Sequence, residues 1–177
     1  MILAFDTYYH PDHTADTVCI AFDDWKNAKI ADCYKEHLGD IADYESGNFY
    51  KRELPCILSL LKKISREDIA TIVVDGFVYL DNDLRYGLGG YLYEALGGAV
   101  PVIGVAKTNF ATLTEHKTAL VRGGSSRPLY ITAIGIDLET AVGNIEKMNG
   151  NFRIPTLLKE LDKMTRDGTH CQPARAK

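Results

Sequence analysis

Two aspartates stand where a carboxylate is costly unless something binds it. Asp6 follows the apolar residues 2–5 inside an expected strand, and Asp75 ends the apolar run 70–74. A carboxylate in such surroundings is expected to be paired, protonated or bound to a metal ion. For either aspartate alone a turn or capping role is the more frequent explanation, and Asp75-Gly76 is also a common turn dipeptide. The two together indicate a site.

Glu53 is the third acidic group that could join this site. If the strands of Asp6 and Asp75 are neighbours in one sheet, their carboxylates converge on one face, and Glu53 lies at the start of an expected helix. Acidic oxygens on rigid elements suit Mg²⁺ or Mn²⁺, which keep several waters for a phosphate substrate. The chemistry that follows is metal-assisted hydrolysis of a phosphodiester bond.

The strands that must position these carboxylates are indicated by apolar patterning. Residues 2–8, 17–22 and 29–34 are separated by turn-forming segments and predict a meander of antiparallel strands. The short apolar runs 70–74 and 101–105 predict two buried parallel strands.

Helical spacing and a later turn signal account for the rest of the chain. A helix is expected to begin near Glu53, and another over residues 84–96 joins the two parallel strands. The further expected elements are a hairpin of residues 118–122 and 129–133, and helices over residues 137–148 and 154–165.

This order of elements favours an α/β fold with an RNase H-like mixed sheet. Its antiparallel strands come first, its parallel strands follow, and helices cover both faces. We expect one domain over residues 1–167 and a disordered tail over residues 168–177.

Composition limits the partners and the location. The net charge of −4 argues against a protein that grips long duplexes by neutralising phosphates, although a local basic rim could still meet a nucleic-acid backbone. The apolar stretches are too short to span a membrane, and the N-terminus has no signal-peptide pattern, so we expect a cytoplasmic protein. The cysteines form no C-x-x-C pair and predict neither a zinc site nor a disulfide framework; Cys19, Cys33 and Cys56 are expected to be buried free thiols.

Several motifs resemble those of the endonuclease V family, in its order and nearly at its spacing. Residues 44–53 resemble the family's Y-x-P-G-x-x-x-F-R-E, residues 74–76 its V-D-G, and residues 101–107 its P-x-I-G-V-A-K. Residues 5–8 and 85–88 add weaker matches, and the similarity extends from residue 2 to about residue 166. The combination is specific, whereas G-V-A-K alone is not.

The resemblance implies an endonuclease that recognises inosine in DNA or RNA. It would cut at the second phosphodiester on the 3′ side and leave 3′-hydroxyl and 5′-phosphate ends. Matching positions give Asp6, Glu53 and Asp75 the metal-site roles, with Mg²⁺ or Mn²⁺ as cofactor, and give Lys107 a place near the scissile phosphate. A cation there can hold a phosphate oxygen or orient the attacking water, although a lysine leaving a strand into solvent is an equally common arrangement.

Further roles are carried over from the same motifs. Glu160 takes the slot of the family's fourth metal ligand, with Asp162 as the near alternative, although an acidic residue on a terminal helix is usually solvated. The expected substrate-binding residues are Tyr8, Tyr44, Gly47, Gly76 and Arg85.

The chain departs from the family where substrate is recognised. Residues 43–46 read Asp-Tyr-Glu-Ser in place of the strand-separating wedge P-Y-I-P, so only the tyrosine is kept. In the base-pocket segment Val78 replaces a glycine, one residue is inserted and no histidine is present, and residues 89–91 lack another histidine. The histidines at positions 10, 13, 37, 116 and 170 match no family motif and are expected to be surface or loop residues. Duplex opening and hypoxanthine specificity are the properties that these changes affect.

Three functions remain open on the sequence. The first is a Mg²⁺-dependent endonuclease, a monomer acting on single-stranded or lesion-containing DNA or RNA and not on membranes. The second is a catalytically altered module on the same fold that binds nucleic acid or protein. The third is a nuclease for branched or RNA–DNA hybrid substrates, for which the sequence holds no separate motif.

Overall fold

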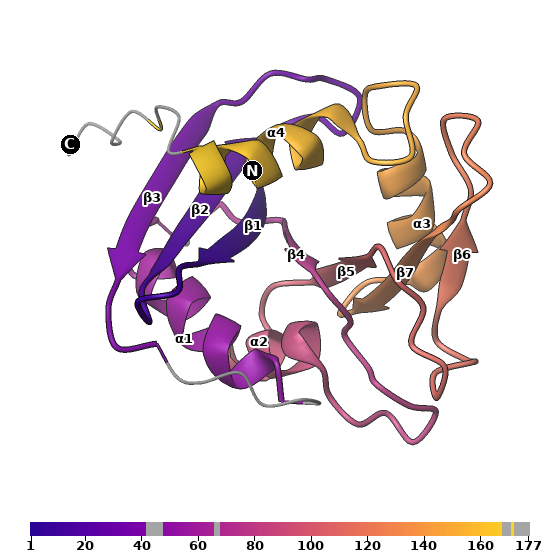
Figure 1. The fold of residues 1–177 in the computed structure, drawn as a ribbon. Coiled ribbons are helices and arrows are strands. Elements are labelled where there is room, and N and C mark those ends of the chain that lie inside the picture. The colour runs from indigo at the N-terminus through magenta and orange to yellow at the C-terminus, as the bar shows by residue number, and fades with distance from the viewer. Residues whose placement is uncertain (42–47, 66–67, 168–170, 172–177) are drawn as a thin grey trace.

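The computed structural model describes residues 1–41, 48–65, 68–167 and 171. They form one mixed sheet of seven strands in the order β3-β2-β1-β4-β5-β7-β6, with helices on both sides (Figure 1). The strands are β1 (Ile2–Tyr9), β2 (Ala15–Phe22), β3 (Asp32–Leu38), β4 (Thr71–Asp75), β5 (Val102–Ala106), β6 (Thr118–Leu120) and β7 (Leu129–Ile134). The helices are α1 (Tyr50–Leu61), α2 (Leu88–Ala95), α3 (Leu138–Glu146) and α4 (Thr156–Asp167).

The strand directions confirm the predicted RNase H-like sheet. The first three strands form an antiparallel meander, and β1, β4 and β5 run parallel to one another. The later hairpin then extends the sheet, because β7 pairs antiparallel with both β5 and β6. Within the described residues, no helix is long and apolar enough to cross a membrane.

Alternation along the strands divides the apolar side chains into two cores. On one face Ile2 and Ala4 of β1 pack with side chains of α3 and α4, such as Ile145 and Leu161. On the other face Leu3 and Phe5 pack with residues of α1 and α2. Since successive strand residues point to opposite faces, β1 must be apolar on both, and the prediction of helices on both faces is confirmed.

Several predicted elements have different boundaries in the structure; α1, for example, begins at Tyr50 and not near Glu53, and for two others the reason is clear. The third strand is β3, three residues later than expected, because it is an edge strand whose half-buried, polar sequence carries little apolar signal. The helix expected over residues 84–96 begins only at Leu88. Leu84 has a φ of 62°, which a helix does not allow, and residues 79 and 86 form a bridge instead.

The expectation that the cysteines form no disulfide is wrong for one pair. Cys33 of β3 is bonded to Cys171, with 5.4 Å between their Cα atoms, across a sequence separation of 138 residues. No local pattern can indicate a partner so distant in the chain. Cys19 and Cys56 are buried free thiols, as predicted. The remainder of the tail expected over residues 168–177 lies outside the described residues.

Gly104 of β5 allows the segment after β4 to cross close to the sheet. A Cβ atom at this position would lie 2.5 Å from the Gly76 carbonyl oxygen and 2.6 Å from Thr132 Oγ1. The same Thr132 hydroxyl accepts a hydrogen bond of 2.9 Å from the Val78 amide. The segment after β4 can therefore cross the sheet this closely only because residue 104 is a glycine.

We expect Gly104→Ala to lower the free energy of unfolding by about 1–3 kcal/mol, because backbone as well as a side chain must move to admit the methyl group. Gly143→Ala in α3 is the matched control, since its Cβ would meet no atom within 4 Å. There the change should stabilise the helix by about 0.5–1 kcal/mol. Urea denaturation measures both, and a neutral Gly104→Ala would contradict the close approach.

Candidate metal centre

Asp6 and Asp75 are brought together by the parallel pairing of β1 and β4. The register pairs Phe5 with Val74, so the two aspartates occupy the next positions along neighbouring strands. Each continues the alternating row that holds Ala4 in β1 and Val73 in β4 on the face covered by α4. The predicted convergence of the two carboxylates on one face is therefore present.

Lys107 follows β5 and reaches the same place. Its Nζ lies 2.9 Å from Asp75 Oδ2 and 3.5 Å from Asp162 Oδ1, which α4 supplies. Burial by itself would lower the pKa of Lys107, but the charge and hydrogen bond of Asp75 and the charges of Asp162 and Asp6 raise it. The lysine is thus a fixed cation among acidic groups.

Helix α4 also holds Asp6. The Thr165 hydroxyl donates a hydrogen bond of 2.8 Å to Asp6 Oδ2, and it lies at the same distance from the Asp162 carbonyl oxygen. Burial raises the pKa of Asp6, and the neighbouring charge of Asp75 adds to the rise, while the hydrogen bond from Thr165 opposes it. Arg166 contacts Asp162 Oδ1 at 3.1 Å on the outer side of the helix.

Glu53 is the most deeply buried acidic group of the site. It lies in the first turn of α1 with 2% of its surface exposed, and its Oε2 is 3.4 Å from the Tyr9 hydroxyl. The Arg52 guanidinium stacks on the same tyrosine ring, 3.9 Å from its centroid. Burial raises the pKa of Glu53 well above its usual value, and the charges of Asp6 and Asp75 raise it further. One long hydrogen bond is little compensation for a buried carboxylate.

These side chains line a pocket of about 190 Å³, and Tyr8, with 38% of its surface exposed, lies among them. All the acidic donors are oxygens, and among the described residues Glu53 accepts only the long hydrogen bond from Tyr9, while the charge of Arg52 lowers its pKa by less than burial raises it. The donor set therefore fits a hard divalent ion such as Mg²⁺ or Mn²⁺. The structure brings Asp6, Glu53, Asp75 and Lys107 into one site, as the sequence predicted.

The fourth acidic residue at the pocket is Asp162 and not Glu160, which was the first expectation. Glu160 is exposed and does not line the pocket, whereas Asp162, the alternative, does. The reason is helical phase: α4 turns Leu157, Leu161 and Thr165 inward, which places residue 162 beside the inner stripe and residue 160 away from it.

The expected substrate-binding residues are not all at the site. Arg85 is 59% exposed in its side chain and pairs with Asp81 at 3.1 Å on the surface, outside the residues that line the pocket. Gly76 lies in a neighbouring pocket described below, and Tyr8 lies at the metal centre. Tyr44 and Gly47 fall outside the described residues.

The neighbouring pocket is aromatic and has a volume of about 170 Å³. Phe49 lines both pockets, so the two are adjacent, and Phe77 faces Phe110 across 5.8 Å between ring centroids. Among the described residues that line it, none is charged or a histidine. The remaining lining residues are Tyr50, Gly76, Leu80, Gly87 and Leu88.

Val78 does not fill this pocket, although it replaces a glycine of the family motif. Its side chain is fully buried and would be 2.8 Å from a Cβ at Gly89. A Cβ at Gly90 would likewise collide with the Tyr86 ring. The substitutions at residues 78 and 89–90 are therefore matched to each other in the core, and the pocket is shaped by the phenylalanines.

Sequence reasoning missed five residues that line this pocket: Thr7, Tyr9, Phe49, Thr165 and Arg166. Thr165 could have been found, because a polar residue that continues the inward stripe of Leu157 and Leu161 must have a buried partner. Tyr9 and Arg166 carry no comparable signal. Both are identified only by their contacts with Glu53 and Asp162.

Comparison with known proteins adds an independent finding. The family model described as endonuclease V matches residues 1–144. No curated protein sequence matches the chain significantly.

Solved structures share the fold at low sequence identity. Endonuclease V from Ciona intestinalis, crystallised with a 23mer DNA that contains an inosine followed by a ribo-adenosine, is similar with a TM-score of 0.81 and 17% identity over 94% of this chain and 84% of that one. For human endonuclease V the values are 0.73 and 20%, over 94% and 83%. Argonaute from A. aeolicus is similar with a TM-score of 0.55 and 14% identity, over 93% of this chain and 28% of that one.

The raised carboxylate pKa of Glu53 makes a prediction for the metal-free protein. A carboxyl group whose pKa is higher in the folded state than in the unfolded state lowers the free energy of unfolding as the pH rises from about 4.5 towards the folded-state pKa. We therefore expect Glu53→Gln, in a chelator, to increase the free energy of unfolding by about 1–3 kcal/mol at about pH 7 and to flatten its fall with pH.

Glu160→Gln is the control for this experiment, because it makes the same chemical change at an exposed position of α4. It should leave both the stability and its pH dependence unchanged. Urea denaturation from about pH 5 to about pH 8 measures the two variants. Equal curves for Glu53→Gln and the unmodified protein would show that Glu53 is not buried as a charged group.

Proposed function

The chain belongs to the endonuclease V family, and from this premise we propose that it is a metal-dependent endonuclease that hydrolyses phosphodiester bonds in DNA or RNA. The observation that supports the proposal most is the convergence of Asp6, Glu53 and Asp75 beside Lys107 in a single pocket. A cytoplasmic location and a monomeric state remain predictions.

Asp6, Glu53 and Asp75 would hold Mg²⁺ or Mn²⁺, and Asp162 is better placed than Glu160 to contribute a fourth oxygen. The ion supplies Lewis-acid stabilisation of the developing negative charge and an acidified water. The role of the protein is to position the ligand oxygens. Thr165 orients Asp6, Tyr9 orients Glu53, and the β-sheet register sets the spacing of the aspartates.

Lys107 provides a cation that does not depend on the metal ion. Its half-buried ammonium group lies at the end of a buried strand, within reach of any phosphate that enters the pocket. Held there by Asp75 and Asp162, it can bind a nonbridging phosphate oxygen without a large reorganisation. Arg166 on the pocket wall adds a second positive charge for the backbone of the nucleic acid.

The aromatic pocket is the place where a base would be bound. A displaced base can stack against Phe49, Phe77 or Phe110. The Ciona enzyme was crystallised with inosine-containing DNA, and we extend that substrate to this chain. Cleavage would follow at the second phosphodiester 3′ to inosine, giving 5′-phosphate products. Because its side chains carry no charge or imidazole, the pocket should discriminate hypoxanthine from adenine weakly.

We expect Asp75→Asn to reduce Mn²⁺-dependent cleavage of labelled inosine-containing oligonucleotides by at least about 10²-fold, since a neutral amide is a poor ligand for a hard cation. Asp6→Asn should behave alike, and Asp162→Asn should lose about tenfold. The control Glu160→Gln should cleave at the unmodified rate.

Single-stranded, double-stranded and RNA versions of the oligonucleotide, each with and without inosine, complete this experiment. Metal-independent binding without cleavage of any of them, unchanged in Asp75→Asn, would instead support the alternative of a catalytically altered binding module. Preference for a branched or RNA–DNA hybrid substrate would favour the third hypothesis.

Phe77→Ala tests the aromatic pocket. Loss of one stacking ring should raise KM for an inosine-containing single strand by about 5–100-fold, because base–aromatic stacking contributes about 1–3 kcal/mol, and should leave metal binding intact. Phe152→Ala removes a ring that is 61% exposed and does not line either pocket, and serves as the control. Equal KM values for the two variants would place the base elsewhere.

A further inference from the structure

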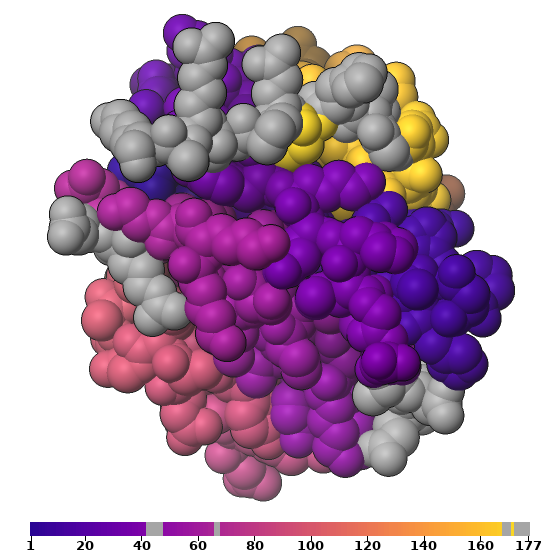
Figure 2. Space-filling model, turned by 90° about the vertical axis from the view of Figure 1, so that its left-hand side faces the viewer, coloured from indigo at the N-terminus to yellow at the C-terminus, as the bar shows by residue number. Residues whose placement is uncertain are grey.

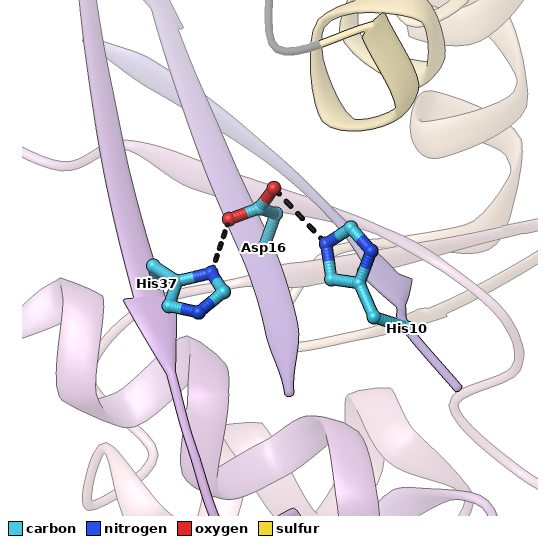
Figure 3. Close-up of side chains that lie close together, drawn as sticks. All are labelled: His10, Asp16 and His37. Atoms are coloured by element: carbon cyan, nitrogen blue, oxygen red, sulfur yellow. Dashed lines mark hydrogen bonds and ion pairs between the residues drawn. The ribbon is translucent and has the colours of Figure 1, made fainter. Parts of the chain in front are cut away.

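A second group of potential metal ligands lies on the same sheet, outside the metal centre. His10 Nε2 is 3.2 Å from Asp16 Oδ2, and His37 Nδ1 is 2.9 Å from Asp16 Oδ1. Figure 3 shows both imidazole rings directed at this one carboxylate. The three ligand atoms all lie within 4.8 Å of one another. No sequence motif joins these histidines, which are expected from the sequence to be separate surface or loop residues.

Strand register explains why the three residues meet. In the antiparallel meander Asp16 of β2 pairs with His37 of β3 on one side and with Tyr8 of β1 on the other. The side chains of these three residues therefore form one row across the strands, and His10 lies two residues beyond Tyr8. His10 follows β1 and is held by a backbone hydrogen bond of 2.9 Å from its amide to the Thr14 carbonyl. The ligand set is therefore fixed by three adjacent segments of regular backbone.

The donors differ in kind from those of the metal centre. Two imidazole nitrogens and one carboxylate oxygen are the ligands of many three-residue zinc sites, in which water completes a tetrahedron. Imidazole favours borderline ions such as Zn²⁺ over Mg²⁺ and Ca²⁺. We propose that His10, Asp16 and His37 bind one Zn²⁺ ion, at a site separate from the carboxylates of Asp6, Glu53 and Asp75.

Asp16 is available as an anionic ligand. Burial on its own would raise its pKa, but hydrogen bonds from His37, His10 and Lys35 lower the pKa of this carboxyl below its usual value. Lys35 Nζ lies 3.2 Å from Asp16 Oδ2, the same oxygen that His10 contacts. A bound ion must displace this ammonium group, and Lys35 thus competes with the metal for the carboxylate.

The position of the site links it to the pocket of the metal centre. The Tyr8 ring packs edge-on against the His10 ring, with 5.1 Å between their centroids, and Tyr8 also lines that pocket. In the face shown in Figure 2 the atoms of the N-terminal strands, in indigo, form the right-hand edge. An ion at His10, Asp16 and His37 would fasten these strands to one another and hold Tyr8 in place.

Zinc titration of the full-length protein tests the proposal. The protein is first freed of metal, then titrated with Zn²⁺ alone by calorimetry, in an Asp75→Asn background that weakens the carboxylate site. We expect one equivalent to bind with an affinity that falls at least about tenfold in His37→Ala and in His10→Ala. Lys35→Met should strengthen binding severalfold, because it removes the competing cation.

His116→Asn is the matched control, since it removes an exposed histidine elsewhere and asparagine tolerates the φ of 55° found there. It should bind Zn²⁺ like the parent. His37 is 60% exposed in its side chain, so its loss should leave the circular dichroism spectrum unchanged. Co²⁺ added in place of Zn²⁺ should give visible absorption that His37→Ala lacks. Equal zinc affinity in the parent and His37→Ala, or no tightening in Lys35→Met together with no cobalt spectrum, would overturn the proposal and leave a hydrogen-bonded His–Asp–His cluster.

Discussion

Mutual repulsion among the clustered carboxylates of the site, of which Glu53 is fully buried, is the constraint around which the rest of the structure is arranged. Asp6, Glu53 and Asp75 each raise the pKa of another member of the group or have their own raised by it, and burial adds to the cost. Among the described residues, Lys107 compensates this charge through its contacts with Asp75 and Asp162, Arg166 also pairs with Asp162, and the charge of Arg52 lowers the pKa of Glu53. Such a group is expensive for a folded protein and is retained where a divalent ion can bind it. The site is thus built at the expense of stability.

A rigid scaffold holds the carboxylates in place despite this loss of stability. A sheet covered on both faces fixes the parallel strands β1, β4 and β5, with Asp6 inside β1, Asp75 at the end of β4 and Lys107 just after β5. Helix α4 lies across β1 and β2 and closes the site from one side with Asp162 and Thr165 (Figure 1). From the other side α1 contributes Glu53. The donors therefore come from elements that cannot move independently.

The segments expected to recognise the substrate are the part of the chain that departs from the family pattern. Val78 fits against Gly89, so these two departures from the family pattern compensate one another inside the core. The pocket left beside the metal centre is lined by phenylalanines and backbone. Selectivity by stacking and shape follows from such a lining, since stacking is available to every base.

The sequence by itself determined Asp6 as a carboxylate inside an apolar strand and Asp75 as one at a strand end. It also determined the mixed sheet with its meander and parallel strands, and the family, because local periodicity and short motifs carry all of these. Tertiary structure alone decided that Asp162 rather than Glu160 faces the site, that Thr165 holds Asp6, and that Cys33 meets Cys171. It also placed His10 and His37 on either side of Asp16. The phase of α4 is a local signal, but which pocket its inner side faces, the strand register and the contacts between residues far apart in the chain arise only when the elements pack together, and no window of neighbouring residues contains that information.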